Sequence, residues 1–202
     1  MRIVFMGTPD FATGTLKALA DAGYEIAAVV TQPDKPKGRG KAMQPTPVKE
    51  MALSLGLPVL QPQKVKEEAF LKQMETIRPD VIVVAAFGQI IPPALLAIPP
   101  LGCVNVHASL LPAYRGAAPI QWAVIDGQKE SGVTIMRMDE GLDTGDMISK
   151  VVVPLAQDET GGSLFDKLSA AGAKLLVETL PSLEQGTAVM EKQPKESPTP
   201  YA

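Results

Sequence analysis

Short apolar runs alternate with longer amphipathic stretches along most of this chain. Five runs have the length and the β-branched content that are typical of strands: residues 3–6, 26–30, 81–85, 104–107 and 133–136. Five stretches carry apolar residues at helical spacing: 10–22, 46–55, 66–77, 117–126 and 162–185. This alternation predicts an α/β fold in which helices flank a mostly parallel, twisted sheet.

The last part of the chain departs from this alternation. Residues 147–154 form an apolar run that follows a glycine-containing turn instead of a helix. A short turn can join antiparallel strands only, so we expect this run to be an antiparallel strand at an edge of the sheet. From residue 187 the chain is polar and rich in proline and lysine, which predicts a surface strand and then a linker.

His107, the only histidine of the chain, stands at the end of the predicted strand 104–107. Side chains alternate along a strand, so Asn105 and His107 point to the same side. A donating amide beside an imidazole suits a reaction in which a carbonyl oxygen gains negative charge. The alternative is a hydrogen-bonded histidine in the core at the end of a strand.

A loop rich in carboxylates, residues 138–146, follows the predicted strand 133–136. Gly141 and Gly145 lie on either side of Asp143 and allow a ligand to approach the main chain. Ligands of open α/β sheets bind beyond the carboxyl ends of the strands, so we expect the loop near His107. An acidic surface turn explains the same residues equally well.

The first turn of the chain, residues 7–11, joins a predicted strand to a predicted helix. It lacks the glycine pattern of a dinucleotide site, and no such site is expected. We expect Thr8 to cap the helix and Pro9 to lie in its first turn.

Residues 32–47 contain four prolines and two glycines, which predict a long mobile loop without regular structure. The loop carries Lys35, Lys37, Arg39 and Lys41, although the whole chain has a net charge of -3. Such a local concentration of cations is suited to a phosphate backbone, and Arg39 can contact both phosphates and base edges. A merely solvated loop is the alternative.

Composition favours one compact enzyme domain, because 202 residues with 46% hydrophobic content can bury a substantial core. A single cysteine, Cys103, cannot form an intramolecular disulfide, and no cysteine and histidine cluster suggests a metal site. No run has the features of a signal peptide or a membrane span. We therefore expect a cytoplasmic, metal-free monomer that does not associate with a membrane.

The candidate site resembles the formyltransferase family that uses 10-formyltetrahydrofolate. The resemblance rests on Asn105, His107, the run Ser109-Leu110-Leu111-Pro112, Arg115-Gly116 and Asp143, in one order and spacing. Within the family, residues 7–11, 31–36, 38–41 and 141–147 resemble members that act on methionyl-tRNA.

This resemblance implies a Rossmann-like formyltransferase fold, with a catalytic domain over residues 1–186. Residues 187–202 would open a linker to a C-terminal β-barrel domain that this chain does not contain. The implied reaction of one-carbon metabolism moves the formyl group of 10-formyltetrahydrofolate to the α-amine of methionyl initiator tRNA for translation initiation, without a metal. Asn105 and His107 would donate to the developing oxyanion, and Asp143 would orient His107.

The resemblance also implies the binding residues. Folate would contact Phe87, Gly88, Gln89, Ile90, Ile91, Ser109, Leu110, Leu111, Pro112, Glu140, Gly141 and Leu142. The tRNA would contact Thr8, Pro9, Asp10, Phe11, Lys35, Lys37, Arg39 and Lys41. Ser109 lacks the context of a nucleophile, so it is expected to contact folate or to cap a turn. Ordinary core packing remains the alternative for Phe87, Ile90 and Leu111.

Three other functions are compatible with the same catalytic residues. Enzymes that formylate a sugar amine or glycinamide ribonucleotide share them, although the turn at 7–11 and the basic loop are not expected in the ribonucleotide enzyme. A hydrolase that transfers the formyl group to water is the second possibility. The third is an RNA-binding module without activity, which would have no need of Asn105, His107 and Asp143 together.

Overall fold

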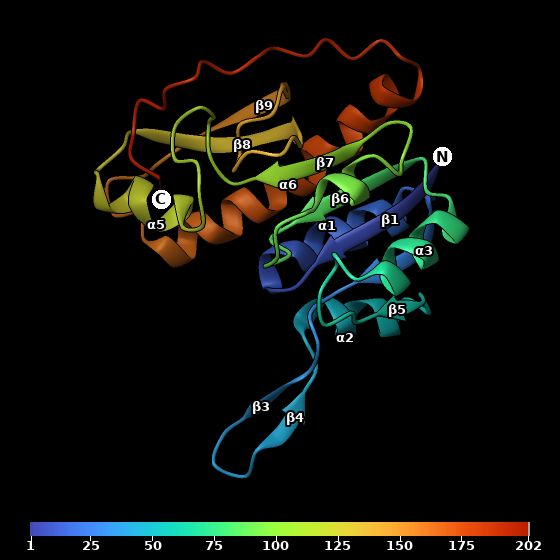
Figure 1. The fold of residues 1–202 in the computed structure, drawn as a ribbon. Coiled ribbons are helices and arrows are strands. Elements are labelled where there is room, and N and C mark those ends of the chain that lie inside the picture. Colours follow the sequence, from blue (N-terminus) through green and yellow to red (C-terminus); the bar gives the residue numbers. More distant parts are fainter. Residues whose placement is uncertain (202) are drawn as a thin grey trace. The chain divides into compact units, whose positions relative to one another are not determined.

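The computed structural model describes residues 1–201, and Figure 1 shows the course of the chain. The chain folds into two compact units, one formed by residues 1–103 and the other by the residues from 104 onward. Within the described residues, no helix is both long enough and apolar enough to cross a bilayer.

The first unit contains four parallel strands in the order β5-β2-β1-β6. Their bounds are β1 (Arg2–Gly7), β2 (Glu25–Val30), β5 (Val59–Leu60) and β6 (Val81–Ala85). Ile3 to Met6 and Val81 to Ala85 are buried on both faces of the sheet. Continuous apolar runs of this kind are typical of parallel strands that have helices on both sides.

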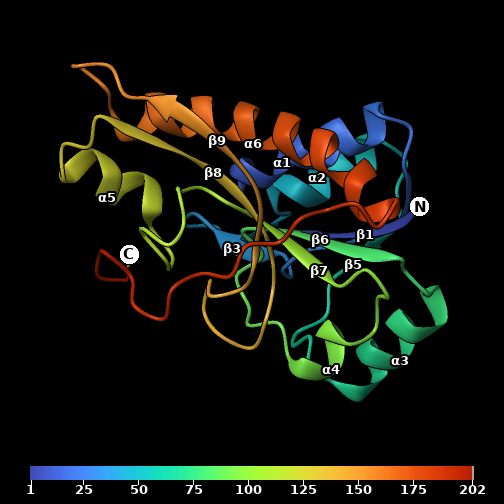
Figure 2. The same ribbon diagram turned by 90° about the horizontal axis from the view of Figure 1, so that it is seen from above.

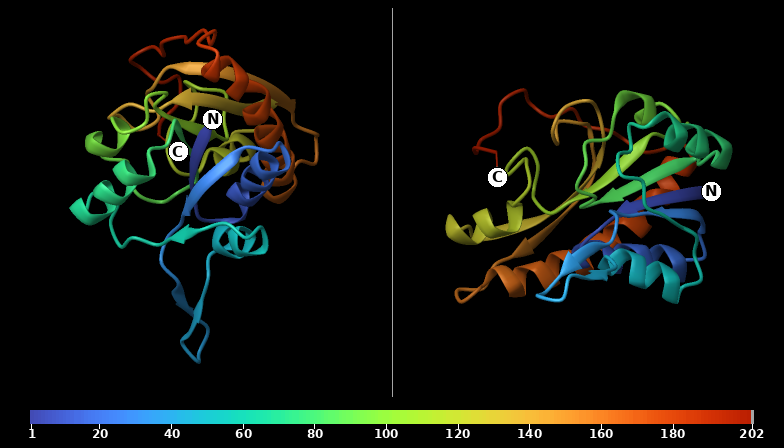
Figure 3. Two further views of the ribbon diagram at one scale, coloured as in Figure 1. Left: turned by 90° about the vertical axis from the view of Figure 1, so that its right-hand side faces the viewer. Right: turned by 60° about the horizontal axis from the view of Figure 1, so that its bottom comes forward.

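Four helices cover this sheet: α1 (Asp10–Asp21), α2 (Pro47–Ser54), α3 (Glu68–Ile77) and α4 (Pro93–Leu96). Figures 2 and 3 show α1 and α2 on one face and α3 and α4 on the other. Leu16 and Leu19 of α1 and Phe70 and Met74 of α3 are among the side chains that these helices bury. The helices therefore supply the apolar cover that the sheet needs.

The basic segment forms a two-stranded antiparallel hairpin, β3 (Lys35–Lys37) with β4 (Ala42–Gln44), which projects from the first unit in Figure 1. The prediction of a loop without regular structure is wrong for these residues. Pro36 lies opposite Met43 in a ribbon whose strands are both edge strands, where a proline is tolerated. Gly38 and Lys41 close the ribbon with positive φ angles of 76° and 50°.

The start of α1 also differs from the prediction, because Thr8 does not cap the helix. Pro9 is the N-cap residue and no side chain caps this end. The Thr8 hydroxyl instead donates to the carbonyl oxygen of Phe87 at 2.6 Å. A hydrogen bond between neighbouring strand ends has taken the place of the local cap.

The second unit contains the antiparallel strands β7 (Cys103–His107), β8 (Glu130–Arg137) and β9 (Met147–Pro154), in that order. Its helices are α5 (Pro119–Ile125) and α6 (Gly161–Glu184), and α6 runs along β8 and β9 in Figure 2. Gly172 of α6 allows close packing, since a Cβ there would lie 3.0 Å from Val106 Cγ1. The prediction of an antiparallel edge strand at 147–154 is confirmed.

After α6 the chain crosses back over β8 and β9 and reaches the neighbourhood of α5 (Figure 1). The surface strand expected here is reduced to one antiparallel bridge between Met147 and Glu191. Overall, the predicted α/β class, with a mostly parallel sheet and flanking helices, is confirmed. The short elements β5 and α4 were not predicted.

Candidate active site

His107 is held between two oxygen atoms at the end of β7, where its side chain is 6% exposed. Its Nε2 lies 2.9 Å from the carbonyl oxygen of Tyr114. A carbonyl oxygen can only accept, so Nε2 carries a proton and donates it. On the other side of the ring, Nδ1 lies 3.8 Å from Oδ2 of Asp143. Nδ1 is therefore the ring position that can exchange a proton with a carboxylate or a substrate.

Asp143 reaches His107 from the loop between β8 and β9, and its side chain is 11% exposed. The same Oδ2 accepts a hydrogen bond from the main-chain nitrogen of Gly116 at 2.9 Å. This bond fixes the carboxylate beside the imidazole. The structure thus brings His107 and Asp143 together, although they lie 36 positions apart in the sequence.

Two residues beside His107 have left-handed backbone conformations, Tyr114 with a φ of 56° and Asp143 with a φ of 55°. Such conformations cost a non-glycine residue on the order of 1 kcal/mol, so other contacts must maintain them. The Tyr114 hydroxyl donates to Asp126 Oδ2 at 2.6 Å and accepts from Gln128 at 2.8 Å. Burial raises the pKa of Tyr114, and the bond to Asp126 raises it further. The phenol is therefore a neutral anchor for the loop.

Asn105 lies on β7 on the same side as His107, opposite Met136 of β8. It is partly buried, and its side-chain amide forms no hydrogen bond within residues 1–201. Partly buried amides are usually paired in a folded protein. The Asn105 amide is therefore available to a bound molecule.

The turn after β7 is held by hydrogen bonds that point into the protein. The Ser109 hydroxyl donates to the carbonyl oxygen of Ala113 at 2.6 Å, and the Ser109 carbonyl accepts from Thr134 Oγ1 at 2.7 Å. Thr134 Oγ1 in turn accepts from the nitrogen of Leu111 at 3.1 Å. Ser109 and Leu111 are fully buried, so the turn-capping alternative describes the Ser109 side chain.

The tip of the 138–146 loop is exposed at Glu140, Gly141 and Leu142. Asp139 Oδ1 accepts from the nitrogen of Gly141 at 2.9 Å and from Thr144 Oγ1 at 2.7 Å, which closes the tip. Gly145 is required at the base, because a Cβ there would lie 1.8 Å from the Arg137 carbonyl oxygen.

The predicted folate residues of the first unit differ in exposure. Phe87 and Ile91 are buried, whereas Ile90 is 86% exposed. The Gln89 amide is fully engaged: Oε1 accepts from the nitrogen of Val65 at 3.0 Å, and Nε2 donates to Gln32 Oε1 at 2.9 Å and to Gln63 O at 3.0 Å. Among the predicted side chains from 87 to 91, Ile90 therefore offers the largest apolar surface to a ligand.

The predicted tRNA residues also lie in the first unit. Lys35, Lys37, Arg39 and Lys41 are exposed along the hairpin, and Asp10 is exposed while Phe11 is buried. A groove of about 290 Å³ at the base of the hairpin is lined by Thr8, Lys35 and Lys37, among others. The structure therefore brings Thr8 to the same surface as the basic hairpin.

Asp34 anchors the base of the hairpin to the first unit. It accepts hydrogen bonds from Gln61 Nε2 at 2.7 Å and from Lys49 Nζ at 3.0 Å. The bond from Gln61 and then the bond from Lys49 lower the pKa of Asp34. The carboxylate thus stays charged and is tied to α2 and to the residue that follows β5.

Sequence reasoning gave no role to two residues that lie close to this site, Arg115 and Gln193. Arg115 belongs to the motif between Ser109 and Asp143, so its position was a usable signal. Gln193 carried no signal, because it lies in a polar segment without periodicity.

Comparison with known proteins places these residues in a family. The family model described as formyl transferase matches residues 1–180. A methionyl-tRNA formyltransferase from Agathobacter rectalis is 63% identical over 199 residues, which is 98% of this chain and 64% of that protein. This chain therefore spans slightly less than two thirds of the length of this curated relative.

Solved structures show the same fold. A glycinamide ribonucleotide transformylase 1 from Symbiobacterium toebii superposes with a TM-score of 0.79 at 19% identity, covering 96% of this chain and 94% of that one. An N-formyltransferase from Helicobacter canadensis, in complex with folinic acid and dTDP-3-aminofucose, gives 0.75 at 19% identity, with 98% and 69% covered. The predicted Rossmann-like formyltransferase fold is confirmed.

Proposed function

Because this chain belongs to the formyl transferase family, we propose that it transfers the formyl group of 10-formyltetrahydrofolate to the α-amine of methionyl initiator tRNA. The product is N-formylmethionyl-tRNA. The observation that carries the proposal is His107, held between Asp143 and the Tyr114 carbonyl on the same side of β7 as the unpaired amide of Asn105. The relative from A. rectalis, at 63% identity, supports the choice of acceptor.

The residues present fit a folate. A pterin with its aromatic tail needs apolar surface together with a few hydrogen-bonding groups. In the first unit, Ile90 supplies exposed apolar surface next to Gly88, whose φ is 99°. In the second unit, exposed Leu142 and the amide of Asn105 supply both kinds of group. When bound, the folate supplies the formyl carbon.

Asn105 and the pair of His107 and Asp143 have different roles in the proposed reaction. The amide of Asn105 donates to the formyl oxygen as that oxygen gains negative charge, and one such donor accelerates related reactions about 100- to 1000-fold. Acylation of an amine releases one proton, and Nδ1 of His107 with Asp143 is placed to hold it for return to the leaving nitrogen. The Tyr114 carbonyl keeps Nε2 protonated, so Nδ1 remains the exchanging position.

The basic hairpin supports a nucleic-acid acceptor. Four exposed cations within residues 35–41 provide local attraction for phosphates in a chain whose net charge is -3. The groove at its base extends this surface to Thr8. We propose that the residues from Thr8 to Phe11 and the four cations contact the acceptor end of the tRNA.

The test follows the release of tetrahydrofolate from 10-formyltetrahydrofolate at low salt, with charged initiator methionyl-tRNA as acceptor. Uncharged tRNA and a sugar amine serve as controls, together with a reaction without acceptor. Release only with the charged tRNA is the expected result. Release with water alone or with the sugar amine would assign the chain to a hydrolase or to a different formyltransferase.

A further inference from the structure

Arg115 is a buried arginine whose hydrogen-bond acceptors all come from one distant segment. It is 2% exposed, and no carboxylate among residues 1–201 forms an ion pair with it. Its Nε and Nη2 donate to Gln193 Oε1 at 3.1 and 3.0 Å. Nη2 also donates to the Pro194 carbonyl at 2.7 Å, and Nη1 to the Lys195 carbonyl at 3.2 Å. A buried guanidinium requires such acceptors, because it cannot lose its charge.

Gln193 connects the Arg115 turn with the Asp143 loop. While its Oε1 accepts from Arg115, its Nε2 donates to the carbonyl oxygens of Asp143 at 2.9 Å and of Gly145 at 2.7 Å. The orientation of this amide is fixed by its partners, since a guanidinium only donates and a carbonyl only accepts. One side chain therefore ties the two loops to each other.

The same segment contacts the turn after β7 at two more points. The Tyr114 nitrogen donates to Thr199 Oγ1 at 2.7 Å, and the Ser197 hydroxyl donates to the Pro112 carbonyl at 2.9 Å. Within residues 1–201, Tyr114 and Asp143 supply the polar partners of His107, and both have left-handed backbones. A strained conformation persists only where surrounding contacts over-determine it.

We propose that residues 193–199, the C-terminal strap, hold the two partners of His107 in place, and that Gln193 and Arg115 are positioning residues of the active site. Gln193 acts on the main chain of Asp143, while Arg115 fixes the turn that carries the Tyr114 carbonyl. In this proposal the strap acts as part of the catalytic unit, whereas residues 187–202 were expected from the sequence to open a linker. The kinetic part of this proposal rests on the proposed function.

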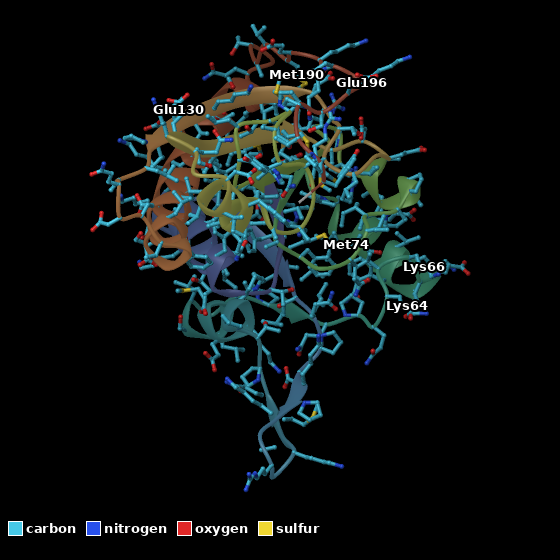
Figure 4. All side chains as sticks on the ribbon, turned by 90° about the vertical axis from the view of Figure 1, so that its left-hand side faces the viewer. Lys64, Lys66, Met74, Glu130, Met190 and Glu196 are labelled. Carbon is cyan, nitrogen blue, oxygen red and sulfur yellow. The ribbon has the colours of Figure 1, made fainter. Side chains whose placement is uncertain are left out.

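The test uses His107 as its own reporter. Because it is the only histidine, the long-range ¹H–¹⁵N spectrum of the labelled protein contains one imidazole and needs no assignment. Gln193→Ala removes both halves of the bridge, whereas Gln193→Glu keeps an acceptor for Arg115 but loses the donor to Asp143 and Gly145. Glu196→Ala is the matched control, since Glu196 is exposed on the same strap, forms no polar contact within residues 1–201, and is labelled in Figure 4.

Both Gln193 variants should move the ring signals of His107 and reduce the share of the tautomer with protonated Nε2, while Glu196→Ala matches the wild type. In transfer assays we expect kcat to fall about 10- to 100-fold in the Gln193 variants, as for a misplaced catalytic group. The KM for folate should change far less. Thermal melts of all three variants identify any that do not fold, and Gln193→Glu retains the Arg115 contact that Gln193→Ala loses.

Ring signals identical to the wild type in folded Gln193→Glu would overturn the proposal, whatever the rates. If wild type and variants all fail to release tetrahydrofolate, the proposed function fails while the ring signals still decide the role of the strap. Shifted signals with unchanged kcat would show that the strap does not position a catalytic group, and would also overturn it.

Discussion

At the scale of single residues, the site depends on which atoms can donate and which can only accept. The Tyr114 carbonyl determines that Nε2 of His107 is protonated, and this leaves Nδ1 directed at Asp143. The separation of 3.8 Å between Nδ1 and Oδ2 is longer than a hydrogen bond. In the proposed reaction, this gap leaves Nδ1 able to exchange a proton with a bound substrate.

His107→Ala should lower kcat for formyl transfer by about 100- to 10,000-fold, because the variant loses the group that exchanges the proton. Folate affinity should stay nearly unchanged, since the groups proposed to hold folate, the Asn105 amide and the exposed side chains of Ile90 and Leu142, are unaltered. Single-turnover rates and fluorescence titration with folate measure the two quantities separately. Unchanged kcat in a folded variant would remove His107 from the mechanism.

Gly145→Ala should destabilise the protein by about 1 to 3 kcal/mol and reduce activity, because its Cβ would lie 1.8 Å from the Arg137 carbonyl oxygen. The main chain at the base of the Asp143 loop must shift to avoid this clash. Gly162→Ala is the control, since the nearest neighbouring atom to its Cβ would be Thr160 Oγ1 at 3.8 Å. Urea unfolding of both variants tests the difference, and equal midpoints would contradict it.

At the scale of elements, the exposed cations and the candidate catalytic residues lie on different elements. The β3–β4 hairpin carries cations on an exposed ribbon whose base is tied down by Asp34. The end of β7 and the β8–β9 loop carry the candidate catalytic residues His107 and Asp143, whose side chains are 6% and 11% exposed. A mobile or exposed element thus suits contact with a large acceptor, while a rigid one suits catalysis.

Arg39→Ala should raise the KM for methionyl-tRNA about 5- to 100-fold, the loss expected for one phosphate or base contact. The KM for folate should not change, because Arg39 lies at the tip of the hairpin. Lys64→Ala is a control of equal charge, since Lys64 is an exposed cation of the first unit outside the hairpin (Figure 4). A similar rise in both KM values, or the same effect from Lys64→Ala, would contradict a specific contact.

The start of α6 should be sensitive to acid. Glu159 has a pKa of about 2, lowered by its hydrogen bonds from Lys167, from Ser163 and from the Ala156 nitrogen, against an ordinary value of 4.5. A lowered pKa in the folded state means that Glu159 stabilises the protein above pH 4.5 and loses this effect as pH falls towards about 2.

The melting temperature of Glu159→Gln should therefore lie below that of the wild type at pH 7, and the gap should close between pH 4.5 and about 2. Glu178→Gln serves as control on the same helix, because Glu178 forms only an exposed pair with Lys174 at 3.9 Å. Calorimetric melts across this pH range measure both variants. A gap that stays constant with pH would refute the assignment.

At the scale of the whole molecule, hydrophobic periodicity was enough to predict the long elements. The apolar runs of β1 and β6 are continuous and buried, and α1, α3 and α6 bury one apolar face each. Elements of two to four residues, β3, β4, β5 and α4, were too short to give a period. The prolines of the hairpin also led to the prediction of a loop, because prolines usually indicate one.

The candidate site was predictable only where a local pattern of the sequence recorded it. Asn105 and His107 share a strand, so their common side followed from alternation, and the turn after β8 indicated the Asp143 loop. The bonds of Gln193 to Arg115, Asp143 and Gly145, and the bond from Tyr114 to Thr199, join residues that are at least 48 positions apart. No local pattern records them. Thr8 likewise bonds to Phe87, which lies 79 positions away and just after β6, instead of capping the helix next to it.

The contacts of Arg115 also have a consequence for the order in which the protein is made. A ribosome incorporates Arg115 nearly eighty residues before the acceptors at Gln193, Pro194 and Lys195. Until these residues leave the exit tunnel, the guanidinium has only water to solvate it, and the turn that carries Tyr114 has no reason to close. The nascent chain can thus complete the helices and strands up to Glu184 before the residues that tie the Arg115 turn to the Asp143 loop become available.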